Sequence, residues 1–172
     1  MKKIRKQIRG GTFETNSSSM HSLVILDKKS RLSPSNLPVN SDETLEIGTG
    51  EFGWGYEMLE TQLEKIEYLF TLLCHYEGIE NQEDLENDMT YIEWVEELEK
   101  YAGIKKVALI NFDGYVDHQS CCSPDEFLST YRTVDAFDED MWEDGKSVSE
   151  RSKFLEVVFD GNVKIEIAND NM

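Results

Sequence analysis

The chain has 172 residues, of which 39% are hydrophobic and 10% aromatic. That is enough to bury one core without disulfides or a structural metal. Acidic residues outnumber basic ones by 35 to 17, which gives a formal net charge of −18. A surface of that sign repels phosphate backbones, so direct nucleic-acid binding is not expected. It attracts basic proteins instead, although it could equally serve only to keep the protein soluble.

Targeting and redox features indicate a cytoplasmic protein. No stretch approaches the ~18 consecutive apolar residues of a membrane span, so no membrane contact is expected. The basic residues near the start are not followed by the apolar run that a secretory signal requires. The 3 cysteines lack the spacing of a disulfide framework, which indicates free thiols in a reducing compartment.

The first half of the chain predicts strands followed by one long helix. Strands are expected at residues 2–9 and 22–27, joined by a polar loop, with an exposed connection over 28–44. A short strand at 45–47 leads into a glycine-rich segment at 48–55. Apolar residues then recur at spacings of four and three, which predicts a helix whose buried face consists of Leu59, Leu63, Ile66, Phe70 and Leu73.

The second half predicts a helical hairpin and a central strand. A second helix is expected from 82 to 102, capped by Asn81, stopped by Gly103 and antiparallel to the first. Its apolar face would consist of Leu85, Met89, Ile92, Val95 and Leu98. The apolar run at 106–112 is typical of a strand covered on both faces. Two further helices and a closing strand are expected at 124–132, 148–159 and 163–167.

This order of elements predicts the fold class. Strands near both ends with helices between them indicate an α+β protein. We expect a single acidic domain over residues 1–172, with a mixed or antiparallel sheet. The helices, including the long helical hairpin, should lie mainly on one face of that sheet.

The glycine-rich segment superficially matches a dinucleotide-binding loop. Gly48, Gly50 and Gly53 satisfy the pattern G-x-G-x-x-G. However, Glu51 would repel phosphates, and the helix that follows leads to a second helix instead of the required strand. The glycines are better explained by a tight turn, or by close packing of Phe52 and Trp54 against the backbone. No cofactor is therefore expected.

A loop of short polar side chains precedes the second strand and supplies candidate binding residues. They are Asn16, Ser17, Ser18 and Ser19, and Glu51 is added by the resemblance described below. Such a loop can donate several hydrogen bonds to an anion or a carbonyl, and His21 is near enough in sequence to serve as a base. The G-x-S-x-G elbow of many hydrolases is absent, and the loop could simply satisfy its own backbone.

A second polar group follows the apolar run. Asp117 can orient His118 for acid–base chemistry, so the candidate catalytic residues are His21, Asp117 and His118. The adjacent Cys121 and Cys122 chelate a tetrahedral metal poorly, and the sequence has no C-x-x-C pair. No metal site is predicted.

Acidic residues cluster on the second predicted helix and again after residue 134. This predicted acidic surface includes Glu83, Asp84, Glu93, Glu96, Glu97, Asp138, Glu139 and Asp140. The array could mimic the phosphates of a nucleic acid, or it could be an ordinary solvated face.

Four segments carry a family resemblance: RGGTFETNSSSMHSL at 9–23, EFGWG at 51–55, DHQS at 117–120 and NDN at 169–171. Together they resemble a group of uncharacterised small proteins of low-GC Gram-positive bacteria and their phages, whose most specific motif is FETNSSSxHS. The resemblance implies a phage or mobile-element setting inside a bacterial host cell, and it implies no mechanism. It also implies that the serine loop, Glu51 and the Asp117–His118 pair form one shared site.

Two functions follow from these observations. The first is an acidic phage or mobile-element accessory protein that binds a basic, nucleic-acid-handling host protein, as a defence inhibitor or nucleic-acid mimic. The second is a small hydrolase or transferase that uses the serine loop with His21 and the Asp117–His118 pair. Binding requires the acids on one exposed face, whereas catalysis requires the polar residues to converge.

Overall fold

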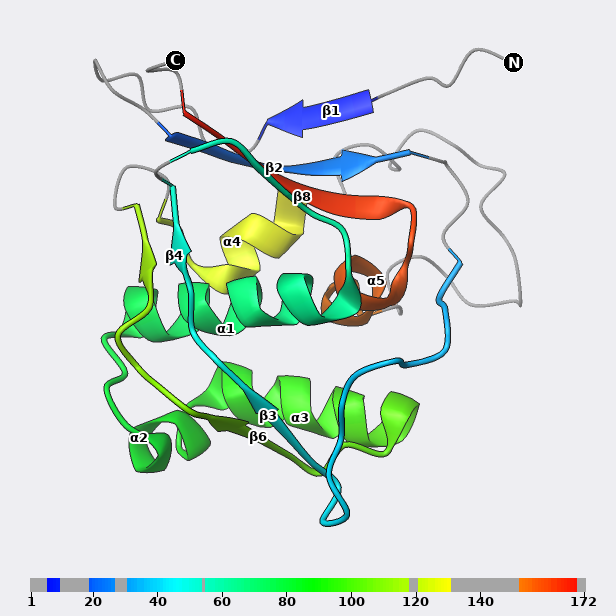
Figure 1. Cartoon of the computed structure of the whole chain (residues 1–172), viewed down its shortest axis with the longest axis vertical. Coiled ribbons are helices and arrows are strands. Elements are labelled where there is room, and N and C mark those ends of the chain that lie inside the picture. Colours follow the sequence, from blue (N-terminus) through cyan, green and yellow to red (C-terminus); the bar gives the residue numbers. More distant parts are fainter. Residues whose placement is uncertain are drawn as a thin grey trace.

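The computed structural model describes residues 6–9, 19–26, 31–53, 55–117, 121–130 and 152–169. Helices, antiparallel strands and parallel strand pairs occur together, which confirms the predicted α+β class. Figure 1 shows the elements, which are β1 (Lys6–Arg9), β2 (Ser19–Ile25), β3 (Thr44–Ile47), β4 (Glu51–Phe52), β5 (Glu57–Leu59), α1 (Gln62–Glu77), α2 (Gln82–Glu86), α3 (Met89–Ala102), β6 (Lys106–Leu109), β7 (Tyr115–Val116), α4 (Pro124–Ser129), α5 (Lys153–Phe159) and β8 (Val163–Asn169).

Strands near both ends of the chain, together with β5, form a four-stranded antiparallel sheet in the order β1-β2-β8-β5. Its central pair is β2 and β8, with Ser19 opposite Asn169. The sheet lies over a layer that contains α1, α4 and α5, and α3 lies on the other side of α1 (Figure 1). Because side chains alternate across a strand, Ser19 and His21 share the helix-facing side of β2 with the core residue Leu23.

Helix α1 runs through the middle of the molecule, and its stretch from Tyr68 to Cys74 is buried around its whole circumference. It begins at Thr61, which exchanges hydrogen bonds with Glu64 in a capping box, and it ends at Gly78 with a φ of 70°. The prediction of a single buried face is wrong, and Leu59 belongs to β5. The buried residues of α1 are Gln62, Lys65, Ile66, Tyr68, Leu69, Phe70, Thr71, Leu72, Leu73 and Cys74.

Lys65 ties α1 to the turn between α5 and β8. The side chain is 1% exposed, and its Nζ donates to the backbone oxygens of Asp160 and Val163, each at 3.0 Å. The buried Asp160 carboxylate accepts from the backbone N–H groups of Arg31 and Asn162. Burial lowers the pKa of Lys65 to about 8, and the charge of Asp160 opposes that shift. This turn is therefore held by a buried polar contact.

The helix predicted over 82–102 is two helices, α2 and α3, so the long helical hairpin is not confirmed. The break lies at Asn87 and Asp88. The Asp88 carboxylate accepts from the N–H of Tyr91 at 3.0 Å and thereby caps a new helix. The predicted cap Asn81 and the predicted stop Gly103 are both confirmed.

The break also changes which residues of α3 face the core. The prediction placed Met89 and Ile92 on a buried face, but Met89 is 68% exposed and Ile92 is 36% exposed. A helix restarted at Asp88 has a new phase relative to Leu85, so the apolar spacing across the break no longer marks one face. The buried residues of α3 are Tyr91, Trp94 and Leu98.

The prediction that 106–112 forms a central strand is wrong. Strand β6 pairs in parallel with β3 in a two-stranded sheet, and β4 pairs with β7 in another. The apolar run is also not covered throughout, because Ile110 leaves the strand and is 75% exposed.

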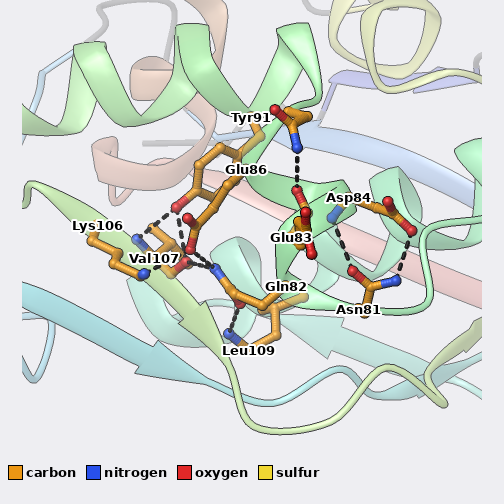
Figure 2. Close-up of polar contacts among 10 residues, drawn as sticks. Asn81, Gln82, Glu83, Asp84, Glu86, Tyr91, Lys106, Val107 and Leu109 are labelled. Carbon is orange, nitrogen blue, oxygen red and sulfur yellow. Dashed lines mark hydrogen bonds and ion pairs between the residues drawn. The ribbon is translucent and has the colours of Figure 1, made fainter.

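Side chains cover the outer edge of β6 and take the positions that a further strand would use (Figure 2). The Gln82 amide donates to the Val107 carbonyl at 3.0 Å and accepts from the Leu109 N–H at 3.1 Å. The Tyr91 hydroxyl donates to the same carbonyl at 3.0 Å and accepts from the Val107 N–H at 3.3 Å. The sheet ends at β6 because α2 and α3 satisfy that edge.

The other elements differ from the prediction mainly in extent. Helix α4 begins at Pro124 with Ser123 as its cap, as predicted, whereas α5 begins later than predicted, after Ser152. Residues 131–151 lie outside the described residues. The short strands β4 and β7 lie outside the predicted elements, and β5 overlaps the start of the predicted first helix, because two or three residues are too few to establish a period of two.

We expect Gln82→Ala to lower the free energy of unfolding by about 1–2 kcal/mol, because it leaves the Leu109 N–H without its partner and removes one of the two donors to the Val107 carbonyl. The exchange of the Leu109 amide should accelerate, which hydrogen-exchange NMR can measure. Asn87→Ala is the control, since that side chain bonds to the exposed α2 backbone. Unchanged Leu109 exchange would contradict the role of Gln82.

Lys65→Met should destabilise the fold by about 1–3 kcal/mol at neutral pH, because it strips the donor from two backbone carbonyls. The folded-state pKa of about 8 lies below the ordinary 10.5. Between these values the unfolded chain binds the proton and the folded chain does not, so the Lys65 contribution to stability rises with pH. Urea unfolding from pH 8 to 10.5 should show the difference between wild type and variant growing. A difference in the free energy of unfolding that stays constant over this pH range would contradict the lowered pKa of Lys65.

Candidate functional site

Ser19 and Asp117 join the beginning of β2 to the end of β7. The Ser19 hydroxyl donates to the Asp117 carboxylate at 2.6 Å, and the Tyr115 hydroxyl approaches its other oxygen at 3.4 Å. The N–H of Asp117 donates to the Phe52 carbonyl at 2.9 Å. In sequence, Ser19 ends the serine loop and Asp117 begins the Asp-His segment. The two polar segments are therefore joined by a hydrogen bond.

Gly53 provides the space that Asp117 occupies. Its φ is 124°, and a Cβ at this position would lie 2.5 Å from the Cβ of Asp117. Any other residue would displace Asp117 from Ser19 and would adopt this φ only with strain. The absence of a side chain at Gly53 therefore allows Asp117 to reach Ser19, and we call Ser19, Tyr115 and Asp117 the polar cluster.

Three backbone donors of the neighbouring loop are already used by side chains of the protein. The N–H groups of Gly48, Thr49 and Gly50 donate to side chains of Glu67, Asn111 and Thr71, at 3.4, 2.8 and 3.1 Å. A dinucleotide-binding loop must direct such groups at its ligand. These geometries support the interpretation that the glycines form a tight turn.

His21 lies beside this cluster and is 5% exposed. Its Nδ1 lies 2.8 Å from the hydroxyl of Tyr68 on α1. Burial raises the pKa of Tyr68 well above its ordinary value, so this hydroxyl keeps its proton. We assign the Tyr68 hydroxyl as donor to Nδ1, which places the proton of the neutral imidazole on Nε2.

The Nε2 of His21 is buried and has no hydrogen-bond partner among the described residues. Burial lowers the pKa of His21 to about 4, and the nearby charge of Asp117 opposes that shift. The imidazole is therefore neutral at pH 7. An unsatisfied buried N–H costs about 1–3 kcal/mol, so this atom marks a polar group that the described residues leave unmatched.

Aromatic rings and thiols surround the Tyr68 side chain. Its ring centroid lies 5.1 Å from that of Phe52 and 5.3 Å from that of Phe127. Burial raises the pKa of Cys121, and it raises that of Cys122 to about 11, so both thiols stay protonated. The cysteines form no disulfide. Within the described ranges, no group of histidine, cysteine and carboxylate side chains could hold a metal ion.

The structure brings together three of the predicted site residues: Ser19, His21 and Asp117. Glu51 is exposed on β4, next to the buried Phe52, and so lies on the other face of that strand. The remaining predicted residues fall outside the described part of the chain, and they are Asn16, Ser17, Ser18 and His118. The prediction missed Tyr68, since a tyrosine on an apolar helix gives no local sign of a distant histidine.

The geometry limits what the described cluster can catalyse. Ser19 is 4% exposed and donates to Asp117, whereas a serine nucleophile must donate to its base. His21 accepts from Tyr68 instead. Among the described residues, the histidine base therefore has no serine nucleophile, and the cluster joins β2, α1 and the end of β7 through hydrogen bonds.

The predicted acidic surface is exposed on α2 and α3 at Glu83, Asp84, Glu93 and Glu96. Glu96 lies 3.9 Å from Lys100, in a weak ion pair. Glu97 differs from the prediction: it is half-buried and accepts from Ser152, and burial raises its pKa. Three further predicted acids lie outside the described residues, and they are Asp138, Glu139 and Asp140.

The short helix α2 is fastened to its surroundings at several points (Figure 2). Its first residue, Gln82, bonds to β6, and the Asn81 side chain accepts from the Asp84 N–H at 2.9 Å. At its end, Glu86 forms a 2.6 Å ion pair with Lys106, and Asn87 donates to the Glu83 carbonyl. The carboxylates of α2 are therefore presented from a fixed backbone.

Comparisons with protein-family models, curated proteins and solved structures give no match. The family resemblance of the four sequence segments consequently stays a prediction. No described helix combines the length and apolar character that crossing a membrane requires.

We expect the stability contribution of His21 to fall with acidity. Its folded-state pKa of about 4 lies below the ordinary 6.5. Between these values the unfolded chain binds a proton that the folded chain does not, so the free energy of unfolding decreases as the pH falls. The loss approaches about 3 kcal/mol at pH 4.

Urea unfolding of wild type and His21→Phe between pH 7 and 4 should show the variant losing less stability. His75→Phe removes a histidine that does not bond to Tyr68, so it serves as the control. NMR titration of the His21 ring should give the same low pKa. A His21 resonance that titrates at 6.5 or above would refute the burial argument.

Proposed function

We propose that the chain is an acidic accessory protein of a phage or mobile element that binds a basic, nucleic-acid-handling host protein through α2 and α3. The supporting observation is that four predicted acids, Glu83, Asp84, Glu93 and Glu96, are exposed on these two successive helices. Carboxylates on a fixed scaffold attract a basic protein and speed its encounter.

The attachment of α2 strengthens this proposal. Binding costs free energy whenever a loop or side chain has to be ordered in the interface. Gln82 anchors α2 on β6, and Asp88 starts α3 at a defined point. The acids are therefore largely pre-positioned, which favours recognition over simple solubility.

The structure bears on how the partner would be recognised. Nucleic-acid mimicry was predicted from the acids of the helix expected at 82–102 together with those after residue 134. The chain breaks at Asn87 and Asp88, Glu97 is half-buried, and the acids after residue 134 lie outside the described residues, so mimicry stays a prediction. Docking onto a basic protein surface does not need carboxylates that are spaced like phosphates. The phage or mobile-element setting is supported by the sequence resemblance alone, and a role as defence inhibitor is one form that such binding could take.

The alternative of a small hydrolase or transferase has one observation in its favour. His21 is buried near Asp117, and its Nε2 has no partner within the described part of the chain, an arrangement typical of groups with perturbed pKa values at functional sites. Against it, Ser19 bonds to Asp117 and not to His21. Binding is therefore the better supported function.

The test is affinity capture from a lysate of a low-GC Gram-positive bacterium at low and high salt. Basic proteins retained by wild type at low salt should be lost at high salt, since screening weakens exposed charge pairs. The variant Glu83→Lys/Glu93→Lys should lose them at both concentrations. The control Glu57→Lys/Asp125→Lys makes the same charge change at exposed positions outside α2 and α3, and it should retain them.

The outcome of the affinity capture distinguishes the binding function from the enzymatic alternative. Retention of the same basic proteins by the α2–α3 variant would overturn the proposed surface. Absence of any basic protein at low salt would overturn the binding function and favour the enzyme. His21→Phe should leave capture unchanged, because His21 is buried beneath the sheet.

A further inference from the structure

We propose that the basic partner docks through a segment that also carries aliphatic or aromatic side chains, which it seats on an apolar patch around α2. This inference rests on the proposed function and names the chemistry of the partner. The apolar patch consists of Tyr76, Met89, Ile92 and Ile110.

Each member of the apolar patch is strongly exposed for a large hydrophobic side chain. Ile110 is 75% exposed, Met89 68%, Tyr76 49% and Ile92 36%. Single exposed apolar residues are common on soluble proteins, but several at one end of a molecule indicate an interaction surface. The four residues of the apolar patch therefore indicate such a surface if they lie at the same end of the molecule.

The fold places these residues at the same end of the molecule. Tyr76 lies in the last turn of α1, Met89 is the first residue of α3, and Ile110 follows β6 directly. Figure 1 shows the end of α1, the start of α3 and the end of β6 grouped around α2. Two interactions agree with this grouping. Burial and, to a smaller extent, the charge of Asp88 raise the pKa of Cys74 in α1, and the Leu109 N–H donates to Gln82 of α2.

The charges around the apolar patch specify a basic partner. On α3, Met89 and Ile92 share one face with Glu93 and Glu96, because these positions are three, four and seven residues apart. On α2, which lies between the end of α1 and the start of α3 in the chain, the exposed acids are Glu83, Asp84 and Glu86. Apolar anchors within a polar rim are the usual anatomy of a protein interface. A complementary segment must present apolar side chains among lysines or arginines.

The contributions of apolar burial and of charge attraction to binding can be measured separately with peptides of defined sequence. The first probe is an amphipathic peptide of leucine and lysine, and the second has serine in place of every leucine. Fluorescence anisotropy should show that wild type binds the leucine peptide about tenfold more tightly, since apolar burial adds to charge attraction. Amide shifts in ¹⁵N spectra should change at α2, the start of α3 and Ile110.

The variant Met89→Ser/Ile110→Ser should bind both peptides equally, at the affinity of wild type for the serine peptide. The control Val39→Ser/Tyr56→Ser alters a side chain that is 37% exposed and one that is 54% exposed. Tyr56 contacts Glu166 of β8, away from the apolar patch, so this control should keep the tenfold preference.

A tenfold preference that survives in Met89→Ser/Ile110→Ser would overturn the apolar patch, and so would equal binding of both peptides by wild type. Either result leaves the acidic surface in place. Failure of wild type to bind the serine peptide at low salt would instead refute the proposed attraction of basic partners. The two proposals therefore fail in distinguishable ways.

Discussion

Helix α1 is enclosed by other elements, and this enclosure determines where those elements lie. The Tyr68 hydroxyl contacts His21 of β2, and Phe70 packs edge-on against Trp94 of α3. Lys65 donates to the carbonyl of Val163 at the start of β8. Water cannot reach the buried side chains of this helix, so their polar groups must find partners within the protein. The contacts of Lys65 and Tyr68 follow from this constraint, and they connect α1 to the antiparallel sheet.

Local signals in the sequence predict which elements form better than they predict how those elements contact one another. The capping box of Thr61 and Glu64 and the glycine at Gly78 are adjacent to the helix they bound, so α1 is predictable in kind. The break at Asn87 and Asp88 is also local, since both residue types favour helix ends. It was hidden because apolar spacing continues across it by coincidence, and the continued spacing produced the wrong buried face for α3.

Long-range pairings could not be predicted from the same information. The position of β6 at a sheet edge depends on Gln82 and Tyr91, which lie far from it in sequence and imitate a strand. The convergence of Ser19 and Asp117 was predictable in outline, because polar residues beside apolar strands lie near sheet ends. Their connection to Tyr68 was not, since it depends on how deeply α1 is buried.

The two polar regions of the molecule differ in a way that bears on function. The cluster around His21 is buried, and its imidazole and thiols are neutral at pH 7, so its hydrogen bonds connect elements of the fold. The surface around α2 is exposed and negatively charged. A need for solubility explains exposed carboxylates, since a chain of charge −18 must keep them in water. It does not explain why Met89 and Ile110 are exposed among them, because apolar side chains gain free energy when covered. The basic partner with apolar side chains that we propose would account for both features.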